Sequence, residues 1–325
     1  MNKRIHIFAT GGTISAAGSE GKTSNYYDGE FDIDALMSSI KGAIALASAE
    51  GEQILNVSSE DISCNDWLYM AKRINEMAKD DDIIGFVITH GTNTMEETAY
   101  FLNLTVKTDK PVVLTGSMRP ATANSADGPQ NLYEAIALAS SEEAVGKGVM
   151  VVFSDAICGA ERVQKMNCFR PDAFGGRDFG YLGYMQDNVP VFLQESAKRH
   201  TVNTEFDISG VDKLPKVEIA YFYADADPDV LRVMAERSDG IVIAGAGSGM
   251  FNKAWKEAVA EISGRIPVVR STRIANGIVA YDQADDEVGS LYGLTHSPVH
   301  ARILLSLALT VTDNKAKIQK MLAEY

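Results

Sequence analysis

The first candidate for chemistry is a threonine hydroxyl that follows an apolar segment near the start of the chain. Thr13 stands directly after Gly11 and Gly12, which follow the apolar segment 4–10. Residues without a Cβ let the backbone turn sharply and let a ligand approach it closely. A threonine hydroxyl attacks a carbonyl carbon only when a neighbouring group takes its proton. Thr13 is therefore either a nucleophile or a turn residue that satisfies local backbone groups.

A second polar corner lies at 89–94, THGTNT, between an apolar segment and a segment with helical spacing. Thr94 and Glu97 match the T-x-x-E capping box, so we predict that Thr94 caps the helix that follows. Thr92 and Asn93 then precede a helix N-terminus, whose free N–H groups and dipole favour a carboxylate or a developing oxyanion. This corner is predicted to hold a substrate anion.

Two side chains could accept the proton of a threonine hydroxyl. Lys165 can act as a base only where burial or nearby positive charge keeps it neutral, because the free lysine pKa is about 10.4. Alternatively, Lys165 is a solvated surface lysine without a catalytic role. His90 ends the apolar segment before the second corner, where a histidine is more often packed in the core than catalytic. The residue types alone do not decide between Lys165 and His90 as the base.

The scaffold that positions these corners is predicted to be an α/β fold. Short apolar segments bounded by glycine or polar turns alternate with segments of helical spacing, which is typical of βαβ units around a buried parallel sheet. In such sheets the ligand lies outside the carboxyl ends of the strands. Chemistry is therefore expected at the corners 9–15, 89–94 and 115–120 and in the stretch 154–165. Strands are predicted at 4–10, 83–90, 111–117, 148–154, 216–223, 239–247 and 266–272, and helices at 67–79, after Thr94, at 131–140 and at 253–263.

The chain is long enough for two domains. It has 325 residues, and the stretch 193–217 is polar, lacks clear periodicity and contains a Leu-Pro pair. Such segments are typical of domain linkers. We predict a larger N-terminal α/β domain with a parallel sheet over 1–195, a linker over 196–217 and a smaller C-terminal α/β domain over 218–325.

Charge and composition favour a small-molecule partner over a nucleic acid or a membrane. With 44 acidic and 30 basic residues, the formal net charge of -14 opposes the phosphate neutralisation on which binding to nucleic acids and anionic membranes depends. The segment 245–250, GAGSGM, nearly matches a dinucleotide fingerprint, but Met250 replaces its last glycine. The five histidines include no H-E-x-x-H motif. We expect neither a metal nor another cofactor.

Cysteine usage and hydropathy bear on the compartment. Three cysteines, Cys64, Cys158 and Cys168, are too few and too irregularly spaced for a disulfide framework or a structural zinc site, so we predict core or free thiols. No run of eighteen apolar residues occurs, and MNKR leads directly into IHIFATGG without the features of a signal peptide. The sequence as written favours the cytoplasm, and the periplasm would apply if a leader had been removed.

Several long motifs occur in a fixed order along the chain. They are ATGGTI at 9–14, SNYYDG at 24–29, THGTNTMEETAYFLNLTVK at 89–107, KPVVLTGSMRP at 110–120 and SADGPQNLYEA at 125–135. In these motifs the chain resembles the bacterial L-asparaginases, and it looks closest to the type II enzymes. The similarity continues to VHARILLSLALT at 299–310, so it covers essentially the whole sequence.

The resemblance implies an amidohydrolase that converts L-asparagine to L-aspartate and ammonia through an acyl-enzyme on threonine. It also implies a homotetramer of two-domain subunits, in which a neighbouring subunit completes each active site, and no cofactor. Thr13 matches the nucleophile and Tyr26 the tyrosine that assists it from a lid. Thr92 matches the second catalytic threonine and Lys165 the lysine that pairs with it. Ser59 and Glu60 match the substrate-binding pair, where the family has Gln or Glu at the second position.

The sequence departs from the family at positions that would hold an amino-acid headgroup. The family corner usually reads HGTDT, and its aspartate contacts the α-ammonium of the substrate and neighbours the lysine, whereas this chain has Asn93. Two positions that the family takes from the neighbouring subunit also differ. Its asparagine becomes Ser248, and its glutamate falls at Ala284, although a slip of the alignment would place Asp285 or Asp286 there. The cysteines of the disulfide found in many type II enzymes have no counterparts at 74–80 and 105–111.

These departures raise an alternative to ordinary asparagine hydrolysis. A neutral amide contacts an ammonium about 1 to 2 kcal/mol less favourably than a carboxylate does. The protein could then prefer an N-substituted asparagine or another small amide such as succinamate. It could also be an impaired variant that binds with little turnover, in which case Asn93→Asp would raise asparaginase activity a hundredfold or more. Loss of the negative charge should also lower the pKa of Lys165.

Overall fold

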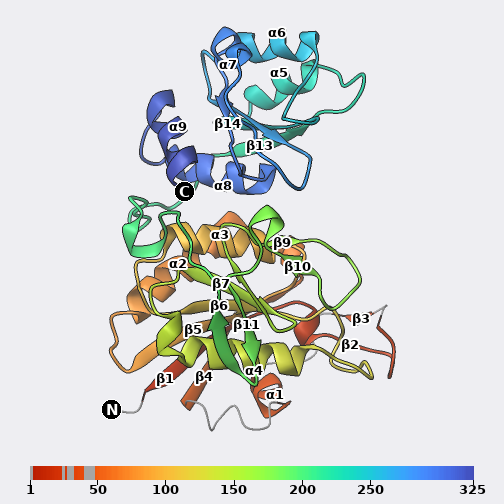
Figure 1. The fold of residues 1–325 in the computed structure, drawn as a ribbon, viewed down its shortest axis with the longest axis vertical. Helices are drawn as coiled ribbons and strands as arrows, with labels where there is room; N and C mark the ends of the chain where they lie inside the picture. The colour runs from red at the N-terminus through yellow and green to blue at the C-terminus, as the bar shows by residue number, and fades with distance from the viewer. Residues whose placement is uncertain (1–2, 24–25, 28–32, 40–47) are drawn as a thin grey trace. The chain divides into compact units, whose positions relative to one another are not determined.

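The protein divides into two compact units, Met1–Thr204 and Glu205–Tyr325. The structure is a computed structural model that describes residues 3–23, 26–27, 33–39 and 48–325 (Figure 1). The division between the units falls inside the segment 196–217 that was predicted as a linker, and the linker bounds themselves stay a prediction. Among the described helices, none is long and apolar enough to span a lipid bilayer.

The first unit is built on an eight-stranded sheet with the order β12-β11-β8-β7-β6-β5-β1-β4. Its strands are β1 (Arg4–Gly11), β4 (Ser48–Val57), β5 (Ile83–Thr89), β6 (Val112–Thr115), β7 (Val149–Phe153), β8 (Ala156–Gly159), β11 (Gly183–Gln186) and β12 (Val189–Phe192). From β4 to β7 all neighbours are parallel, whereas β8, β11 and β12 are added antiparallel. Two small antiparallel pairs complete the strands of this unit, β2 (Ala17–Gly18) with β3 (Tyr26–Tyr27) and β9 (Gln164–Lys165) with β10 (Phe174–Gly175).

Helices cover both faces of this sheet, which explains why its central strands are apolar throughout. Helix α4 (Gly128–Ser140) lies on one face, and α2 (Cys64–Met77) and α3 (Met95–Thr105) lie on the other (Figure 1). The helix α1 (Ile33–Ser39) also belongs to this unit. The α4 face of the core combines Leu132 and Ile136 of the helix with Ile7, Val87 and Val113 of three strands. Strands buried on both faces read as continuous apolar runs, so they were visible in the sequence.

The second unit has a four-stranded parallel sheet with the order β13-β14-β15-β16. Its strands are β13 (Val217–Tyr221), β14 (Gly240–Gly245), β15 (Val268–Thr272) and β16 (Leu291–Tyr292). Its helices are α5 (Asp229–Ala235), α6 (Lys253–Ile262), α7 (Gln283–Val288), α8 (Pro298–Ala308) and α9 (Lys315–Glu324). Trp255 of α6 is fully buried against Phe222 and Phe251 in the core of this unit.

The predicted fold class is confirmed, with one difference in strand direction. All seven predicted strands and all four predicted helices are present, with ends that differ by a few residues. In the large sheet the strands β4, β8, β11 and β12 were missed. The strand β16, the short strands β2, β3, β9 and β10, and the helices α1, α5, α7, α8 and α9 were also missed. The edge strands β4 and β12 contain many exposed or half-buried residues and therefore lack a continuous apolar run. The sheet is consequently mixed rather than purely parallel.

Candidate active site

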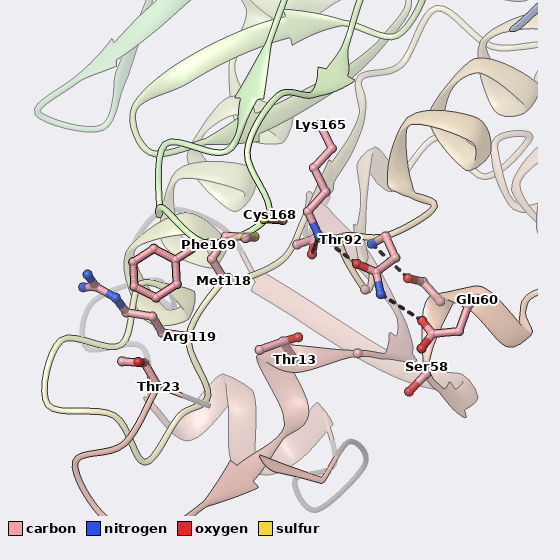
Figure 2. A pocket seen from close by; sticks show the side chains of 14 residues that line it. Thr13, Thr23, Ser58, Glu60, Thr92, Met118, Arg119, Lys165, Cys168 and Phe169 are labelled. Atoms are coloured by element: carbon pink, nitrogen blue, oxygen red, sulfur yellow. Dashed lines mark hydrogen bonds between the residues drawn. The ribbon is translucent and has the colours of Figure 1, made fainter. Parts of the chain in front are cut away.

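A cavity of about 530 Å³ opens at the carboxyl ends of four neighbouring strands of the large sheet (Figure 2). Each strand is followed by cavity-lining residues: β4 by Ser58, Ser59 and Glu60, β1 by Gly12 and Thr13, β5 by Gly91, Thr92 and Asn93, and β6 by Met118 and Arg119. Lys165, Cys168, Phe169 and Thr23 complete the lining among the described residues. The corners that the sequence singled out therefore meet at one site.

Two glycines and a serine bring three of these corners into direct contact. A Cβ added to Gly12 would lie 2.3 Å from Cα of Gly91, and a Cβ added to Gly91 would lie 2.8 Å from Cβ of Ser59. Real Cβ atoms do not approach other atoms so closely. Gly12 also has a φ of 79°, which a residue with a side chain adopts only with strain. Thr13, Thr92 and Ser59 thus line one cavity because their neighbours have no side chain or a small one.

We expect Gly12→Ala to lower the amidase activity that the resemblance implies by more than about a hundredfold, because its methyl group would push the corner of Thr13 away from that of Thr92. Gly146→Ala is the matched control. Gly146 has a similar φ of 74°, but nothing lies within 4 Å of an added Cβ. Both variants place a side chain at positive φ, and Gly12, with a ψ of −174°, also lies in a region that essentially only glycine adopts. Equal losses of activity and of thermal stability in the two variants would contradict the importance of the contact.

Lys165 joins the second corner through its side-chain nitrogen. The Nζ atom lies 2.8 Å from Oγ1 of Thr92 and 2.8 Å from Oδ1 of Asn93 (Figure 2). The residue is held in the short strand β9, which pairs with β10 at Phe174. Burial lowers the pKa of Lys165, and the charges of Cys168, Glu60 and Glu96 oppose that effect. A half-buried lysine beside a threonine hydroxyl can exchange a proton with it.

The corner after β4 is tied to the corner after β5 by three hydrogen bonds. The backbone N–H of Asn93 donates to Oγ of Ser59 at 3.1 Å, and its Nδ2 donates to Glu60 at 3.1 Å. The hydroxyl of Thr94 donates to the backbone carbonyl of Ser59 at 2.6 Å. The prediction that Thr94 and Glu97 form a capping box is therefore wrong. Thr94 stands at the N-cap of α3, but its hydroxyl is used to hold the neighbouring corner.

His90, the alternative base, lies in the core beneath the corner. Its Nδ1 lies 2.7 Å from the carbonyl oxygen of Gly91, and its Nε2 lies 2.8 Å from Oγ1 of Thr98. A carbonyl can only accept, so Nδ1 carries the proton and Nε2 accepts from the Thr98 hydroxyl. Burial lowers the pKa of His90 to about 4, so the ring is neutral at pH 7. The geometry favours Lys165 over His90 as the base.

The remaining predicted site residue of the first unit is Tyr26. Its backbone lies in β3, opposite Gly18, and its side chain lies outside the described part of the chain. Its predicted role as an assisting tyrosine stays a prediction.

Comparison with known proteins identifies the family of this chain over almost its full length. The family model for the asparaginase N-terminal region matches residues 4–198, and the model for the glutaminase/asparaginase C-terminal domain matches residues 216–322. The chain belongs to the asparaginase family. The resemblance in its motifs is thereby confirmed.

Individual members of the asparaginase family are similar over almost the full length. L-asparaginase 2 of Bacillus subtilis is 44% identical over 99% of this chain and 86% of the relative. A probable periplasmic L-asparaginase of Haemophilus influenzae is 41% identical over 99% of this chain and 93% of the relative. The crystal structure of a probable cytoplasmic L-asparaginase from Campylobacter jejuni has a TM-score of 0.96 and 44% identity, and the match covers 99% of this chain and 100% of that one.

This asparaginase-family site also contains residues that the sequence analysis did not single out. Met118, Arg119, Cys168 and Phe169 line the cavity on the side away from Glu60 (Figure 2). The corner 115–120 was predicted to carry chemistry, which covers the first two. Cys168 is an exposed free thiol and Phe169 is 71% exposed. They follow Lys165 by only three and four residues, and this proximity is the one signal that could have pointed to them.

Glu96 is a further residue that the sequence analysis missed. It lies in the first turn of α3, and its carboxylate accepts a hydrogen bond from the backbone N–H of Lys165 at 2.5 Å. Burial raises the pKa of Glu96 from 4.5 to about 7, while the hydrogen bond from Lys165 opposes that effect. Glu96 therefore changes its charge near neutral pH, directly beneath the lysine of the asparaginase site.

We expect Glu96→Gln to shift the rising limb of the pH–activity profile to lower pH. The amide keeps an acceptor for the Lys165 N–H but never ionises, so above pH 7 the lysine loses a negative neighbour and its pKa falls.

The stability of Glu96→Gln gives a second measurement. Because the folded-state pKa of Glu96 is raised, its stabilising contribution is complete below pH 4.5 and is lost as the pH rises through about 7. The variant should gain melting temperature relative to wild type at pH 8 but not at pH 4.5, and an unchanged pH–activity profile would contradict the coupling to Lys165.

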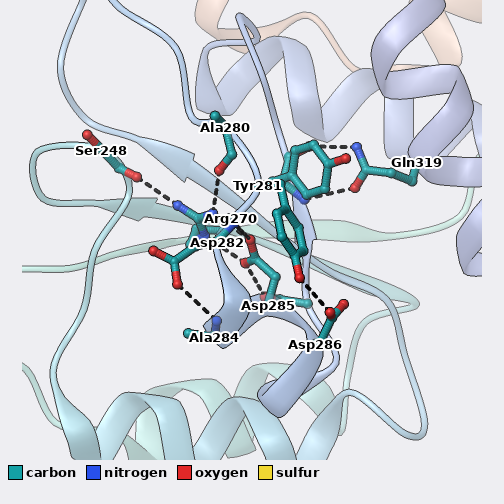
Figure 3. Close-up of polar contacts among 11 residues, drawn as sticks. Ser248, Arg270, Ala280, Tyr281, Asp282, Ala284, Asp285, Asp286 and Gln319 are labelled. Atoms are coloured by element: carbon teal, nitrogen blue, oxygen red, sulfur yellow. Dashed lines mark hydrogen bonds and ion pairs between the residues drawn. The ribbon is translucent and has the colours of Figure 1, made fainter.

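Ser248 and Ala284, which match positions that the family takes from a neighbouring subunit, both lie in the second unit (Figure 3). Arg270 donates to the backbone carbonyl of Ser248 at 2.8 Å and to both carboxylate oxygens of Asp285 at 2.7 and 2.6 Å. Asp285 is buried in this ion pair and also closes the capping box of α7. Asp286 is exposed and accepts a hydrogen bond from the Tyr281 hydroxyl at 2.6 Å. Of the two carboxylates suggested as replacements for the family glutamate, only Asp286 lies outside the Arg270 ion pair.

Proposed function

We propose that this protein hydrolyses L-asparagine to L-aspartate and ammonia through an acyl-enzyme on Thr13. The observation that carries the proposal is the 2.8 Å contact between Nζ of Lys165 and Oγ1 of Thr92 in a cavity that Thr13 also lines. The L-asparaginases that are similar over 99% of the chain support the same reaction.

The reaction has two steps. The hydroxyl oxygen of Thr13 attacks the side-chain amide carbon of asparagine, the C–N bond breaks, and the leaving NH₂ group takes up the hydroxyl proton to depart as ammonia. Water then attacks the resulting ester, so that aspartate leaves and Thr13 regains its proton. Thr92 and Lys165 serve as the pair that accepts and returns protons, because a neutral lysine amine can accept from the Thr92 hydroxyl. The half-burial of Lys165 lowers its pKa and so favours the neutral form.

The headgroup of asparagine has a charge-complementary partner in the cavity. Among the described lining residues, Glu60 is the only carboxylate. A carboxylate binds an ammonium by a charge-assisted hydrogen bond worth about 1.5 to 3 kcal/mol. We assign Glu60 to the α-ammonium group, and Ser59 and Asn93 to the rest of the headgroup. This assignment favours asparagine over N-substituted or amine-free amides, which would leave the Glu60 carboxylate without its cation.

Ammonia release from a panel of amides tests the function. We expect the highest kcat/KM for L-asparagine, with lower values for L-glutamine, succinamate and N-acetyl-L-asparagine. Succinamate lacks the α-amine and N-acetylasparagine lacks its charge, so both should lose about tenfold or more. Turnover of either of these two above that of asparagine would favour the alternative substrate class. No ammonia from any amide would contradict the proposed function.

We also propose that the protein is a homotetramer in which a neighbouring subunit contributes to each site. The second unit exposes aromatic and aliphatic side chains that a partner could cover. Tyr221, Tyr223, Ile278 and Tyr281 are each more than half exposed in the single chain. These exposed side chains are candidates for contact with a neighbouring subunit. Sedimentation should give about four times the chain mass of 35.1 kDa, and a monomer that is active at nanomolar concentration would contradict the proposal.

A further inference from the structure

Two carboxyl groups face each other where helix α4 meets the turn between β7 and β8. Glu134 of α4 is 1% exposed, and its Oε2 accepts a hydrogen bond from the backbone N–H of Asp155 at 3.3 Å. Its Oε1 accepts from Nε2 of Gln130 at 2.8 Å. A side-chain hydrogen bond also joins Glu134 to Asp155. Two carboxylates have no donor between them, so this bond requires a proton on one of the two groups.

The surroundings of Glu134 place the loss of this proton near neutral pH. Burial, followed by the hydrogen bond and the charge of Asp155, raises the pKa of Glu134 to about 7, and the hydrogen bond from Gln130 opposes that effect. The strands β5, β6, β7 and β12, which pack against α4, contain no charged residue. In β1, Arg4 and His6 form ion pairs with other carboxylates. Further acidic residues flank the ends of α4 or lie in the β11–β12 turn, namely Asp127, Glu142, Glu143 and Asp187.

The same helix holds the backbone of the β7–β8 turn. Ser154 and Asp155 have φ angles of 48° and 66°, a left-handed conformation that residues with a side chain adopt only at a cost. The N–H of Ser154 donates to Oδ1 of Asn131 at 3.1 Å, just as the N–H of Asp155 donates to Glu134. Positions 131 and 134 are three residues apart and share one face of the helix. Helix α4 therefore supplies the acceptors that hold both residues of the turn.

The β7–β8 turn supports the hairpin that carries Lys165. Oγ of Ser154 donates to the backbone carbonyl of Pro171 at 3.0 Å. The ring of Phe153, the last residue of β7, lies 4.9 Å from the ring of Phe174. Phe174 is the residue of β10 that pairs with Lys165 in β9. A displacement of the turn would therefore move the base of the proposed mechanism.

We propose that Glu134 and Asp155 are a proton-sharing pair that positions Lys165 through the β7–β8 turn. The inference rests on the proposed function and extends it to residues that do not line the described cavity. While the pair keeps one proton, the two carboxyl groups attract each other and the turn is held. When that proton leaves to solvent, two buried carboxylates repel each other, so the turn and the β9–β10 hairpin loosen.

Glu134→Gln tests the pair because its amide is a permanent donor in place of the shared proton. The variant should keep Lys165 in position at a pH where the wild type does not. The ratio of kcat values, variant over wild type, should be about 1 at about pH 5.5 and about three to ten at about pH 8.5. KM for L-asparagine should stay within about twofold, since Ser59 and Glu60 follow β4 rather than the hairpin. The ionisation of Lys165 itself occurs in both proteins and cancels in the ratio.

Three further variants separate the pair from a general loss of structure. Asparagine tolerates positive φ and its amide donates to Glu134, so Asp155→Asn should show the same pH-dependent gain. Glu134→Ala offers neither donor nor acceptor and should lower kcat at both pH values. Glu143→Gln makes the same chemical change as Glu134→Gln on an exposed residue, and its kcat ratio should be about 1 throughout.

Melting temperatures give a measurement of the pair that is independent of the substrate. Because the folded-state pKa of Glu134 is raised, its stabilising contribution is complete below pH 4.5 and is lost as the pH rises through about 7. Glu134→Gln should therefore gain melting temperature relative to wild type at about pH 8.5 but not at pH 4.5.

Hydrogen exchange follows the hairpin itself and distinguishes this inference from the function on which it rests. Backbone amides of residues 164–175 should exchange about threefold faster in the wild type than in Glu134→Gln at about pH 8.5, and equally fast at about pH 5.5. If the wild type releases no ammonia from any amide, the proposed function is wrong, and the exchange rates still decide whether the pair holds the hairpin. If the wild type is active and either the kcat ratio or the exchange ratio is the same at both pH values, the inference is wrong and the function stands.

Discussion

Thr13→Ala is expected to lower kcat/KM for L-asparagine by about ten-thousandfold or more, with the protein still folded. The variant removes the oxygen that forms the acyl bond, and no other described residue occupies its place at the end of β1. Losses of about this size are typical when an enzyme loses its nucleophile. Ammonia release under saturating asparagine, with a melting curve for each protein, measures the effect.

Two further variants sharpen this experiment. Thr13→Ser keeps a hydroxyl on a less constrained side chain and should recover part of the activity. Thr23→Ala makes the same chemical change in a threonine that lines the same cavity. It should stay within about threefold of wild type, because substitutions away from the reacting groups have small effects. If Thr13→Ala hydrolysed asparagine at the wild-type rate, the acyl-enzyme mechanism would be wrong.

Lys165→Met is expected to lower kcat by about a thousandfold and to remove the rising limb of the pH–activity profile. Methionine retains much of the lysine stem but has no proton to give and no basic lone pair, so Thr92 loses its partner at 2.8 Å. KM for asparagine should change less than kcat, because the Glu60 carboxylate remains. Steady-state rates between about pH 6 and pH 9 distinguish the two parameters.

Lys147→Met provides the matched control for this variant. Lys147 is a half-buried lysine that forms an ion pair with Glu195 at 2.8 Å and does not line the described cavity. Its replacement should lower stability by about 1 kcal/mol or less and leave kcat and its pH dependence unchanged. Equal losses of kcat in the two variants would show that a missing lysine acts through stability rather than through proton transfer.

Local sequence patterns were sufficient to predict the central strands, the helices α2, α3, α4 and α6, and the corners of the site. The continuous apolar runs at β1, β5, β6 and β7 exist because both faces of these strands are covered. Glycines at 11 and 12 marked the sharp turn before Thr13. These signals act over a few residues, so one sequence is enough to find them.

Contacts between distant segments were not predictable in the same way. The bonds from Asn93 to Glu60 and to Lys165 join corners that only the folded sheet brings together. The capping box predicted for Thr94 and Glu97 was wrong for the same reason, because the hydroxyl of Thr94 donates to the backbone carbonyl of Ser59 instead. Glu96 was missed because its importance depends on burial beneath Lys165, which the spacing of α3 does not reveal.

The close backbone contact between Gly12 and Gly91 means that some positions lining the cavity tolerate substitution and others do not. Positions 12, 59 and 91 are packed so closely that larger side chains do not fit between them. Randomised libraries that include these positions would consist mostly of inactive proteins. Met118, Arg119, Cys168 and Phe169 lie on loops across the cavity from Glu60. A directed-evolution campaign for new amide substrates should confine its diversity to these four positions.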